Sequence, residues 1–320
     1  MFIVYKSNSL NRLLLKAYHI IQKKPLSNIF EKEIFVHDNK ILFQYLNIFF
    51  AEKTGISANF KLYHPNYFIW KLFKIILSKK KIKNTFTHAM IAWEIMKILD
   101  NKNFLEYYNE KLDNIQKFKF SFLMANIFEQ YIVYRPNWIN EWEKEQNISI
   151  TDPIAKWQKK LWMKITSNIK KIYPFSCHFA KLFYSIQALI QEKKIKKKYL
   201  PNRCFIISDL TLNPSYIKIL KKISTYINIY FLYITPCKNN IFYLIQDNKV
   251  SLNEKIEKKN MFHNSLIMLW IQYEKIYSLY IIQSKKIKKI NCFKKNKNDN
   301  LLNNIKNDFL EGNKLKKKDY

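Results

Sequence analysis

Three short stretches of this 320-residue chain combine aromatic rings with amide, carboxylate or guanidinium groups: residues 43–46, 55–70 and 128–138. Such mixtures suit nucleic acid, because rings stack on bases while amides and guanidinium groups bond base edges and phosphates. Core packing is the competing interpretation for most of the rings, since large aromatic side chains are usually buried.

Arg135 stands out within the third stretch. The chain has 56 basic residues, and only Arg12, Arg135 and Arg203 among them are arginines. A planar guanidinium forms paired hydrogen bonds that a lysine cannot reproduce. Arg135 is therefore predicted to bind phosphate or a base edge, or else to form a buried ion pair, and the sequence leaves both interpretations open.

No catalytic arrangement is found in the sequence. The four cysteines form no CxxC pair and the six histidines no HExxH motif, so neither a zinc site nor a redox motif is predicted. Glu141, Glu143 and Glu145 are interpreted as a solvated helix face. Asp209 follows a predicted strand as a magnesium ligand would, but a turn or cap residue is the simpler interpretation.

A nucleotide-binding loop is also missing. Such a loop needs glycines that let backbone amides approach phosphate, and the chain has only Gly55 and Gly312. The turn at residues 37–40, which follows the second predicted strand, has no glycine. An ATP-driven helicase is therefore disfavoured, and no cofactor is expected in this chain.

The formal charge of +32 favours a polyanionic partner. The abundance of Lys, Asn, Ile, Tyr and Phe also resembles the drift of an AT-rich genome, so charge alone supports nucleic-acid binding without establishing it. Apolar runs reach six residues, far below the roughly 20 that a membrane helix needs. A cytoplasmic protein with reduced cysteines and no membrane segment is expected.

The flanks of the candidate residues alternate between strands and helices. Residues 2–5 and 34–36 are predicted strands, each followed by a helical pattern, at 10–21 and 40–53. Strands return at 204–208 and 227–234, with a helix between them after Pro214. This alternation predicts a parallel sheet with helical crossovers.

Between these parts the pattern is helical throughout. Helices are predicted at 68–78, 88–99, 115–133, 154–172 and 179–191. The predicted organisation is an α/β domain formed by residues 1–64 and 200–245, a helical insertion at 65–199, and a basic, partly disordered tail at 246–320. The tail contains one predicted helix at 265–283 and is expected to be poorly ordered after Lys285.

Colinear motifs along the chain resemble the RecC family, the gamma subunit of exodeoxyribonuclease V. The match runs from residue 1 to about residue 310 and is weakest over 240–300. The motifs are Val4-Tyr5-x-Ser7-Asn8-x-Leu10, Gln44-Tyr45-Leu46, Gly55-Ile56-x-Ala58-Asn59, Phe68-Ile69-Trp70, Gln130-Tyr131-x-Val133-Tyr134-Arg135-Pro136-x-Trp138, Thr235-Pro236-Cys237 and Leu301-Leu302-x-Asn304-Ile305-x-x-Asp308.

The resemblance implies a RecA/helicase-like sheet that has lost its P-loop. It also implies a non-catalytic subunit that joins RecB-like and RecD-like motor subunits at double-stranded DNA ends, guides single-stranded DNA and scans it for Chi during repair and recombination. ATP and Mg²⁺ would belong to the partners. Because family members are several times longer, the alternative is a truncated remnant that binds nucleic acid outside any complex.

The resemblance also assigns a DNA-reading surface. Gln44 is expected to bond a base edge, Trp70 to stack, and Arg135 to hold phosphate or guanine. The other members of the surface are Asn126, Ile127, Glu129 and Gln130. Several positions depart from the family: Asn126 replaces an aspartate, and Asp38, Lys40, His64 and Phe179 replace a Gln, a Thr, a Leu and an Arg. These departures put specific recognition of Chi in question.

Overall fold

The computed structural model describes residues 1–77, 82–100, 113–144, 152–208, 212–238, 287–297 and 300–311. The chain divides into two compact units. Met1–Trp70 and Lys197–Tyr320 form the first unit, and Lys71–Lys196 form the second.

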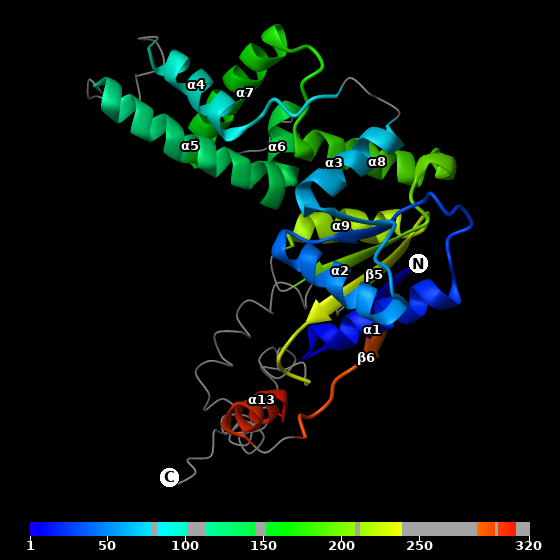
Figure 1. Ribbon diagram of the computed structural model, residues 1–320. Coiled ribbons are helices and arrows are strands. Elements are labelled where there is room, and N and C mark those ends of the chain that lie inside the picture. Colours follow the sequence, from blue (N-terminus) through cyan, green and yellow to red (C-terminus); the bar gives the residue numbers. More distant parts are fainter. Residues whose placement is uncertain are drawn as a thin grey trace, which may run out of the picture. The chain divides into compact units, whose positions relative to one another are not determined.

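The first unit is built on a six-stranded sheet in which every pairing is parallel (Figure 1). The strand order is β3-β2-β4-β5-β1-β6. The strands are β1 Phe2–Ser7, β2 Glu33–Val36, β3 Phe60–Tyr63, β4 Arg203–Ser208, β5 Asn228–Ile234 and β6 Lys288–Asn291. The α/β class and the parallel sheet predicted from the sequence are therefore confirmed.

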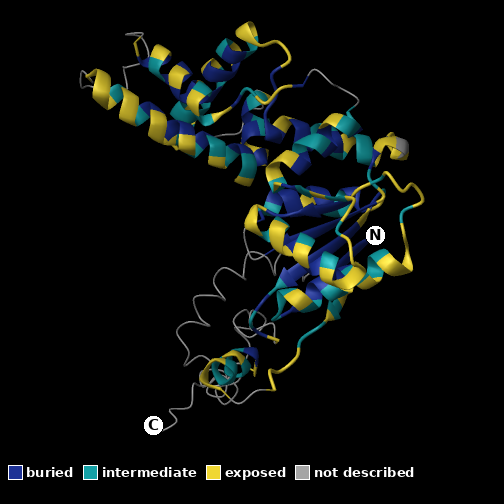
Figure 2. Ribbon diagram, viewed as in Figure 1, coloured by how far each residue is buried: buried dark blue, intermediate teal, exposed yellow. Residues whose placement is uncertain are grey.

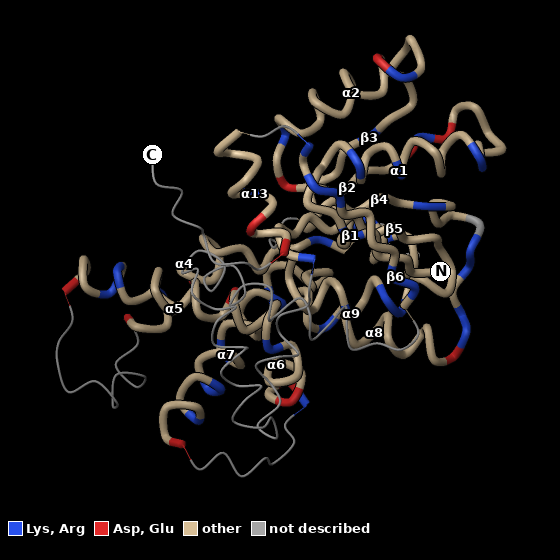
Figure 3. The backbone as a smooth tube through the Cα atoms, turned by 90° about the horizontal axis from the view of Figure 1, so that it is seen from below, with Lys and Arg blue, Asp and Glu red and all other residues tan. Residues whose placement is uncertain are grey.

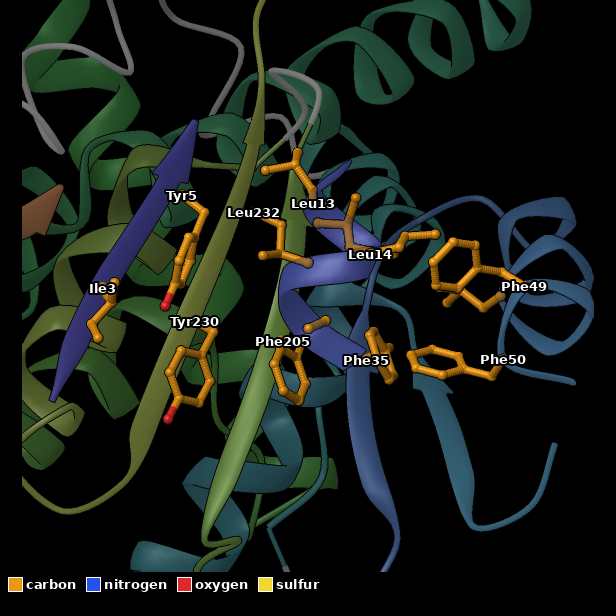
Figure 4. Packing of buried hydrophobic residues seen from close by; sticks show 13 residues of the cluster. Ile3, Tyr5, Leu13, Leu14, Phe35, Phe49, Phe50, Phe205, Tyr230 and Leu232 are labelled. Atoms are coloured by element: carbon orange, nitrogen blue, oxygen red, sulfur yellow. The ribbon is translucent and has the colours of Figure 1, made fainter. Parts of the chain in front are cut away.

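Helices cover both faces of this sheet (Figure 1). On one face, α1 and α2 pack over aromatic and aliphatic side chains that include Phe35, Phe205 and Tyr230 (Figure 4). On the other face lies α9, where Tyr216 donates a hydrogen bond of 3.2 Å to Asn66 of α3. The helices are α1 Leu10–Lys23, α2 Ile41–Thr54, α3 Pro65–Ile76 and α9 Pro214–Ile223. Because both faces are covered, the central strands read as continuous apolar runs.

The local chemistry of the chain explains where these helices begin and end. Asn39, just before the N-cap residue Lys40, accepts a hydrogen bond of 2.8 Å from the Ile41 amide at the start of α2. The same helix ends at Gly55, whose φ of 77° is the left-handed conformation that glycine adopts without strain. Asn213 is the N-cap of α9, and its side chain accepts a hydrogen bond of 2.9 Å from the Ser215 amide.

Two strands and one helix of the first unit were not predicted. β3 and β6 are four residues long and largely polar or half-exposed, so they lack the apolar run by which the other strands were identified. β6 pairs with β1 at the edge of the sheet, and α13 spans Leu301–Glu311. The expectation of poor order after Lys285 was therefore wrong for these two segments. The predicted helix at 265–283 lies outside the described residues.

In its described part the second unit is helical, apart from an isolated bridge between Lys83 and Ser176. Its helices, besides the last turns of α3, are α4 His88–Leu99, α5 Asn114–Tyr134, α6 Pro136–Glu143, α7 Pro153–Ile172 and α8 Phe179–Gln191. The bounds predicted for α4 and α8 are confirmed to the residue, whereas α6 was missed. Fully buried Trp162 and Phe128 pack at the centre, with ring centroids 5.3 Å apart.

Within the described residues, every helix is either too short or too polar to cross a lipid bilayer.

Candidate nucleic-acid interface

The α5 helix presents two of the predicted DNA-reading side chains to solvent. Asn126 and Gln130 are both exposed, and because they are four residues apart they lie on the same side of the helix. Figure 2 shows exposed positions recurring along α5. Ile127 and Glu129 are half-buried beside this side of the helix. The opposite side packs into the unit through Ser121, Met124, Ala125, Phe128 and Ile132.

Arg135 lies at the junction between α5 and α6. Its amide donates to the carbonyl of Tyr131 at 2.9 Å and ends α5, while its own carbonyl accepts from the Trp138 amide at 3.0 Å and starts α6. Pro136 supplies a fixed φ at the first position of α6. The chain therefore turns at Arg135 and leaves its side chain exposed.

The Arg135 guanidinium lies over the Trp138 ring, 5.4 Å from its centroid. Trp138 is 40% exposed, so the outer face of this pair is open to solvent. The ion pairs found among the described residues do not include Arg135. A cation that rests on a ring in this way retains hydrogen-bond donors for a phosphate or a base edge.

Arg203 provides the contrasting case. It is buried in β4 and bonds both carboxylate oxygens of Glu33 in the neighbouring strand β2. A third bond goes to the Lys24 carbonyl. A buried ion pair, one of the two interpretations left open for Arg135, is thus found at Arg203 instead. Arg203 forms the buried ion pair, and Arg135 remains exposed on a ring.

Gln44 and Trp70 belong to the first unit, whereas the other five predicted residues belong to the second. Gln44 is exposed on α2, and Trp70 is half-buried on α3. Phe179, which stands where the resemblance expects an arginine, is buried between Phe73 and Phe183, with ring centroids 5.6 and 5.8 Å away. The side chain at that position packs in the core of the second unit.

Three side-chain hydrogen bonds lie at the carboxyl edge of the sheet, the edge at which parallel α/β proteins bind nucleotides. His37, at the end of β2, places Nδ1 3.1 Å from the carbonyl of Ile207 in β4. Ser7, the last residue of β1, donates to the Cys292 carbonyl at 3.0 Å, and Asn8, which follows it, donates to the Lys294 carbonyl at 3.1 Å. Asp209 lies outside the described residues. No group of metal-binding side chains is found in the described parts of either unit.

The interpretation of the glutamate cluster as a solvated face is wrong for Glu143. This carboxylate is 2.7 Å from Nε2 of buried His178 and accepts a hydrogen bond of 3.3 Å from the Trp162 indole. Lys170 lies 3.8 Å away. Burial alone would raise the pKa of Glu143, but the hydrogen bond from His178, with the charges of Lys170 and Lys181, brings that pKa below its ordinary value. Glu145 lies outside the described residues.

His178 also caps α8, because its Nδ1 accepts the Lys181 amide at 3.3 Å. Nδ1 is therefore the unprotonated nitrogen, and Nε2 carries the proton that bonds Glu143. The arrangement joins α6, α7 and α8, and its distribution over three helices explains why no sequence motif indicated it. Its geometry is that of a structural polar core rather than a catalytic pair open to substrate.

Comparisons with known proteins give one consistent result. Residues 2–312 match the family described as "RecC, N-terminal domain". The chain is 68% identical to the RecBCD enzyme subunit RecC of Buchnera aphidicola subsp. Acyrthosiphon pisum, over 99% of this chain and 30% of that protein. It is 30% identical to the Haemophilus influenzae subunit over 82% of this chain and 26% of that protein. It is 25% identical to the Escherichia coli subunit over 96% and 30%. The chain thus spans less than a third of the length of these relatives.

Proposed function

The chain belongs to the RecC family, and we propose that it acts as a non-catalytic DNA-binding part of a RecBCD-type helicase-nuclease (exodeoxyribonuclease V). In this role it holds and guides single strands that RecB-like and RecD-like subunits unwind from double-stranded ends during repair and recombination. The assembly would act in the cytoplasm.

The observation that carries this proposal is the exposed Arg135–Trp138 pair at the end of α5. The pair offers guanidinium donors for phosphate beside a ring on which a base can stack. The amides of Asn126 and Gln130, farther along the exposed side of α5, can each donate to and accept from a base edge. Phosphate contact, stacking and base reading are the three elements of single-strand recognition.

The non-catalytic part of the proposal rests on the carboxyl edge of the sheet. We propose a RecA/helicase-like domain in which a nucleotide cradle has been replaced by side chains. The His37 contact with Ile207 crosses from β2 to β4, where the following helices α2 and α9 lie on opposite faces of the sheet. Such a switch point is the usual ligand crevice. ATP and Mg²⁺ would then be bound by the partner subunits.

The proposal also covers recognition of the specific sequence Chi. The family has an aspartate where this chain has Asn126, and a carboxylate only accepts hydrogen bonds, whereas an amide also donates. The base preferred at that position should change accordingly. With Phe179 buried, a further contact expected from the resemblance is absent. We therefore propose that strand guidance is retained while the preferred sequence differs from that of the family.

The test is the affinity of the full chain for single-stranded oligonucleotides. Arg135→Lys keeps the charge but loses the planar fork, and weaker binding is expected. Arg12→Lys, on α1 of the first unit, is the matched control. Co-purification with the two motor subunits distinguishes a chain that is a member of the complex from a truncated remnant that acts outside it. Strand binding without co-purification would favour the remnant, and unchanged binding by Arg135→Lys would remove Arg135 from the interface.

A further inference from the structure

An aromatic cluster lies on the surface of the second unit between α4 and α5. The ring centroids of Trp93 and Phe118 are 6.4 Å apart, and those of Phe118 and Phe122 are 5.2 Å apart. His88 extends the row, with its ring 4.3 Å from Phe122 and its Nε2 3.0 Å from the Phe122 carbonyl. Neither the candidate residues nor the motifs considered above include any member of this row.

These rings are unusually exposed for their size. Trp93 is 55% exposed, and Phe118 and Phe122 are 43% and 44% exposed. Trp93 and Trp138 are the two exposed tryptophans of the described residues, and they lie near opposite ends of α5. Large exposed apolar groups that gather in one place mark a binding surface, because scattered ones are the normal pattern.

One member of this row, Phe122, lies on the same side of α5 as the candidate strand-binding residues. Phe122, Asn126 and Gln130 follow one another at intervals of four residues, which places them along one side of the helix. From Phe122 to Arg135 the distance along the helix is roughly 20 Å, enough for several nucleotides. One exposed side of α5 thus carries a ring and then two amides, and Arg135, which lies over the Trp138 ring, follows at the end of the helix.

Charges near the rings do not oppose a polyanion. Glu94, next to Trp93, is paired with Lys97 at 2.7 Å, and Asp100 is paired with Lys117 at 2.7 Å. Between Lys119 and Glu129, α5 carries no charged residue (Figure 3). An uncharged aromatic surface contacts the faces of bases, which are accessible in a single strand and hidden in a duplex.

We propose that Trp93, Phe118 and Phe122 form a base-stacking platform that extends the strand-binding track of α5 toward its amino end. This inference rests on the proposed function, because the strand must first be held by the interface around Arg135. The platform binds without sequence preference, since every base has a face to stack. A protein partner on the same rings is the competing occupant.

The test compares ring-removing with ring-retaining substitutions in the full chain. Phe118→Leu, Phe122→Leu and Trp93→Leu keep an apolar surface but remove the ring, whereas Phe122→Tyr and Trp93→Phe retain one. Each leucine variant is expected to weaken binding of a long oligo-dT about fivefold or more, which is the size of one stacked base. The ring-retaining variants are expected to bind like wild type, as are Phe30→Leu and Tyr199→Leu, which remove exposed rings of the first unit.

Oligonucleotides with abasic spacers complete the test, because a spacer removes the base and leaves the phosphate. A run of spacers placed over the platform should weaken binding by wild type and change little for the triple leucine variant. Strand binding that neither the substitutions nor the spacers alter would overturn the platform and leave the proposed function intact. If the leucine variants keep strand binding but lose a protein partner, the platform is overturned in favour of a protein contact. If wild type binds no oligonucleotide, both proposals fail.

Discussion

The carboxylate of Glu143 in α6 lies 2.7 Å from Nε2 of His178, the residue that caps α8. His178 is 1% exposed and stands edge-on to the rings of Phe86 and Trp162. The charged member of the pair is Glu143, which is only 15% exposed, and the buried imidazole of His178 cannot form its hydrogen bond with water instead. The pair therefore holds α6 and α8 together.

Glu143→Gln is expected to lower the free energy of unfolding by about 2 kcal/mol at neutral pH, because a neutral amide accepts a weaker hydrogen bond from His178 than a carboxylate does and no longer attracts Lys170. The folded-state pKa of Glu143 is lowered, so its stabilising contribution is present above the ordinary glutamate range and is lost as pH falls through the folded value. Urea unfolding at neutral and acid pH measures both effects. Glu141→Gln on the same helix is the control, and an equal loss there would contradict the assignment.

Arg203→Met is expected to cost about 3–5 kcal/mol, because it leaves Glu33 buried without its partner. The double variant Arg203→Met, Glu33→Leu should recover much of that loss, since no unpaired charge remains. Chemical unfolding of the single and double variants measures the coupling between the two side chains. Arg12→Met, at a half-buried position on α1, should change stability far less. Additive losses at positions 203 and 33 would show that the pair is not coupled.

Arg135→Ala should weaken single-strand binding and reduce the slope of log affinity against log salt by about 0.7, because one phosphate contact is lost. Trp138→Leu should weaken binding without changing that slope, since the ring carries no charge. Neither change should lower stability by more than about 1 kcal/mol, because the pair is exposed. Fluorescence anisotropy at several salt concentrations provides the slopes. An unchanged slope for Arg135→Ala would place Arg135 away from phosphate.

Neither wild type nor His37→Ala is expected to hydrolyse ATP. Removing the imidazole takes away its contact with the Ile207 carbonyl at the ends of β2 and β4 but supplies no glycine cradle. The substitution should cost about 1 kcal/mol of stability for one lost hydrogen bond. A coupled ATPase assay on the chain alone, together with thermal unfolding, measures both. Turnover that Asp209→Ala abolishes would overturn the non-catalytic assignment.

Much of the architecture could be read from local patterns. The bounds of α4 and α8 follow from apolar residues at helical spacing with a capping residue before each, Thr87 and His178. β4 and β5 follow from continuous apolar runs, as expected for strands covered on both faces. β3 and β6 could not be found in this way. A short strand without an apolar run is recognised only by the strand with which it pairs. Residues 288–291 pair with β1, which lies far away along the chain.

The sequence by itself determined that arginine is rare here, that glycine occurs only twice, and that strands and helices alternate in the first unit. It did not distinguish the three arginines or the three glutamates from one another. The tertiary structure assigned Arg203 to a buried carboxylate, Arg135 to an exposed ring, and Glu143 to His178. The reason is physical: the role of a charged side chain depends on its burial and on its partners. The partners of Arg203 and Glu143 lie 170 and 35 residues away along the chain.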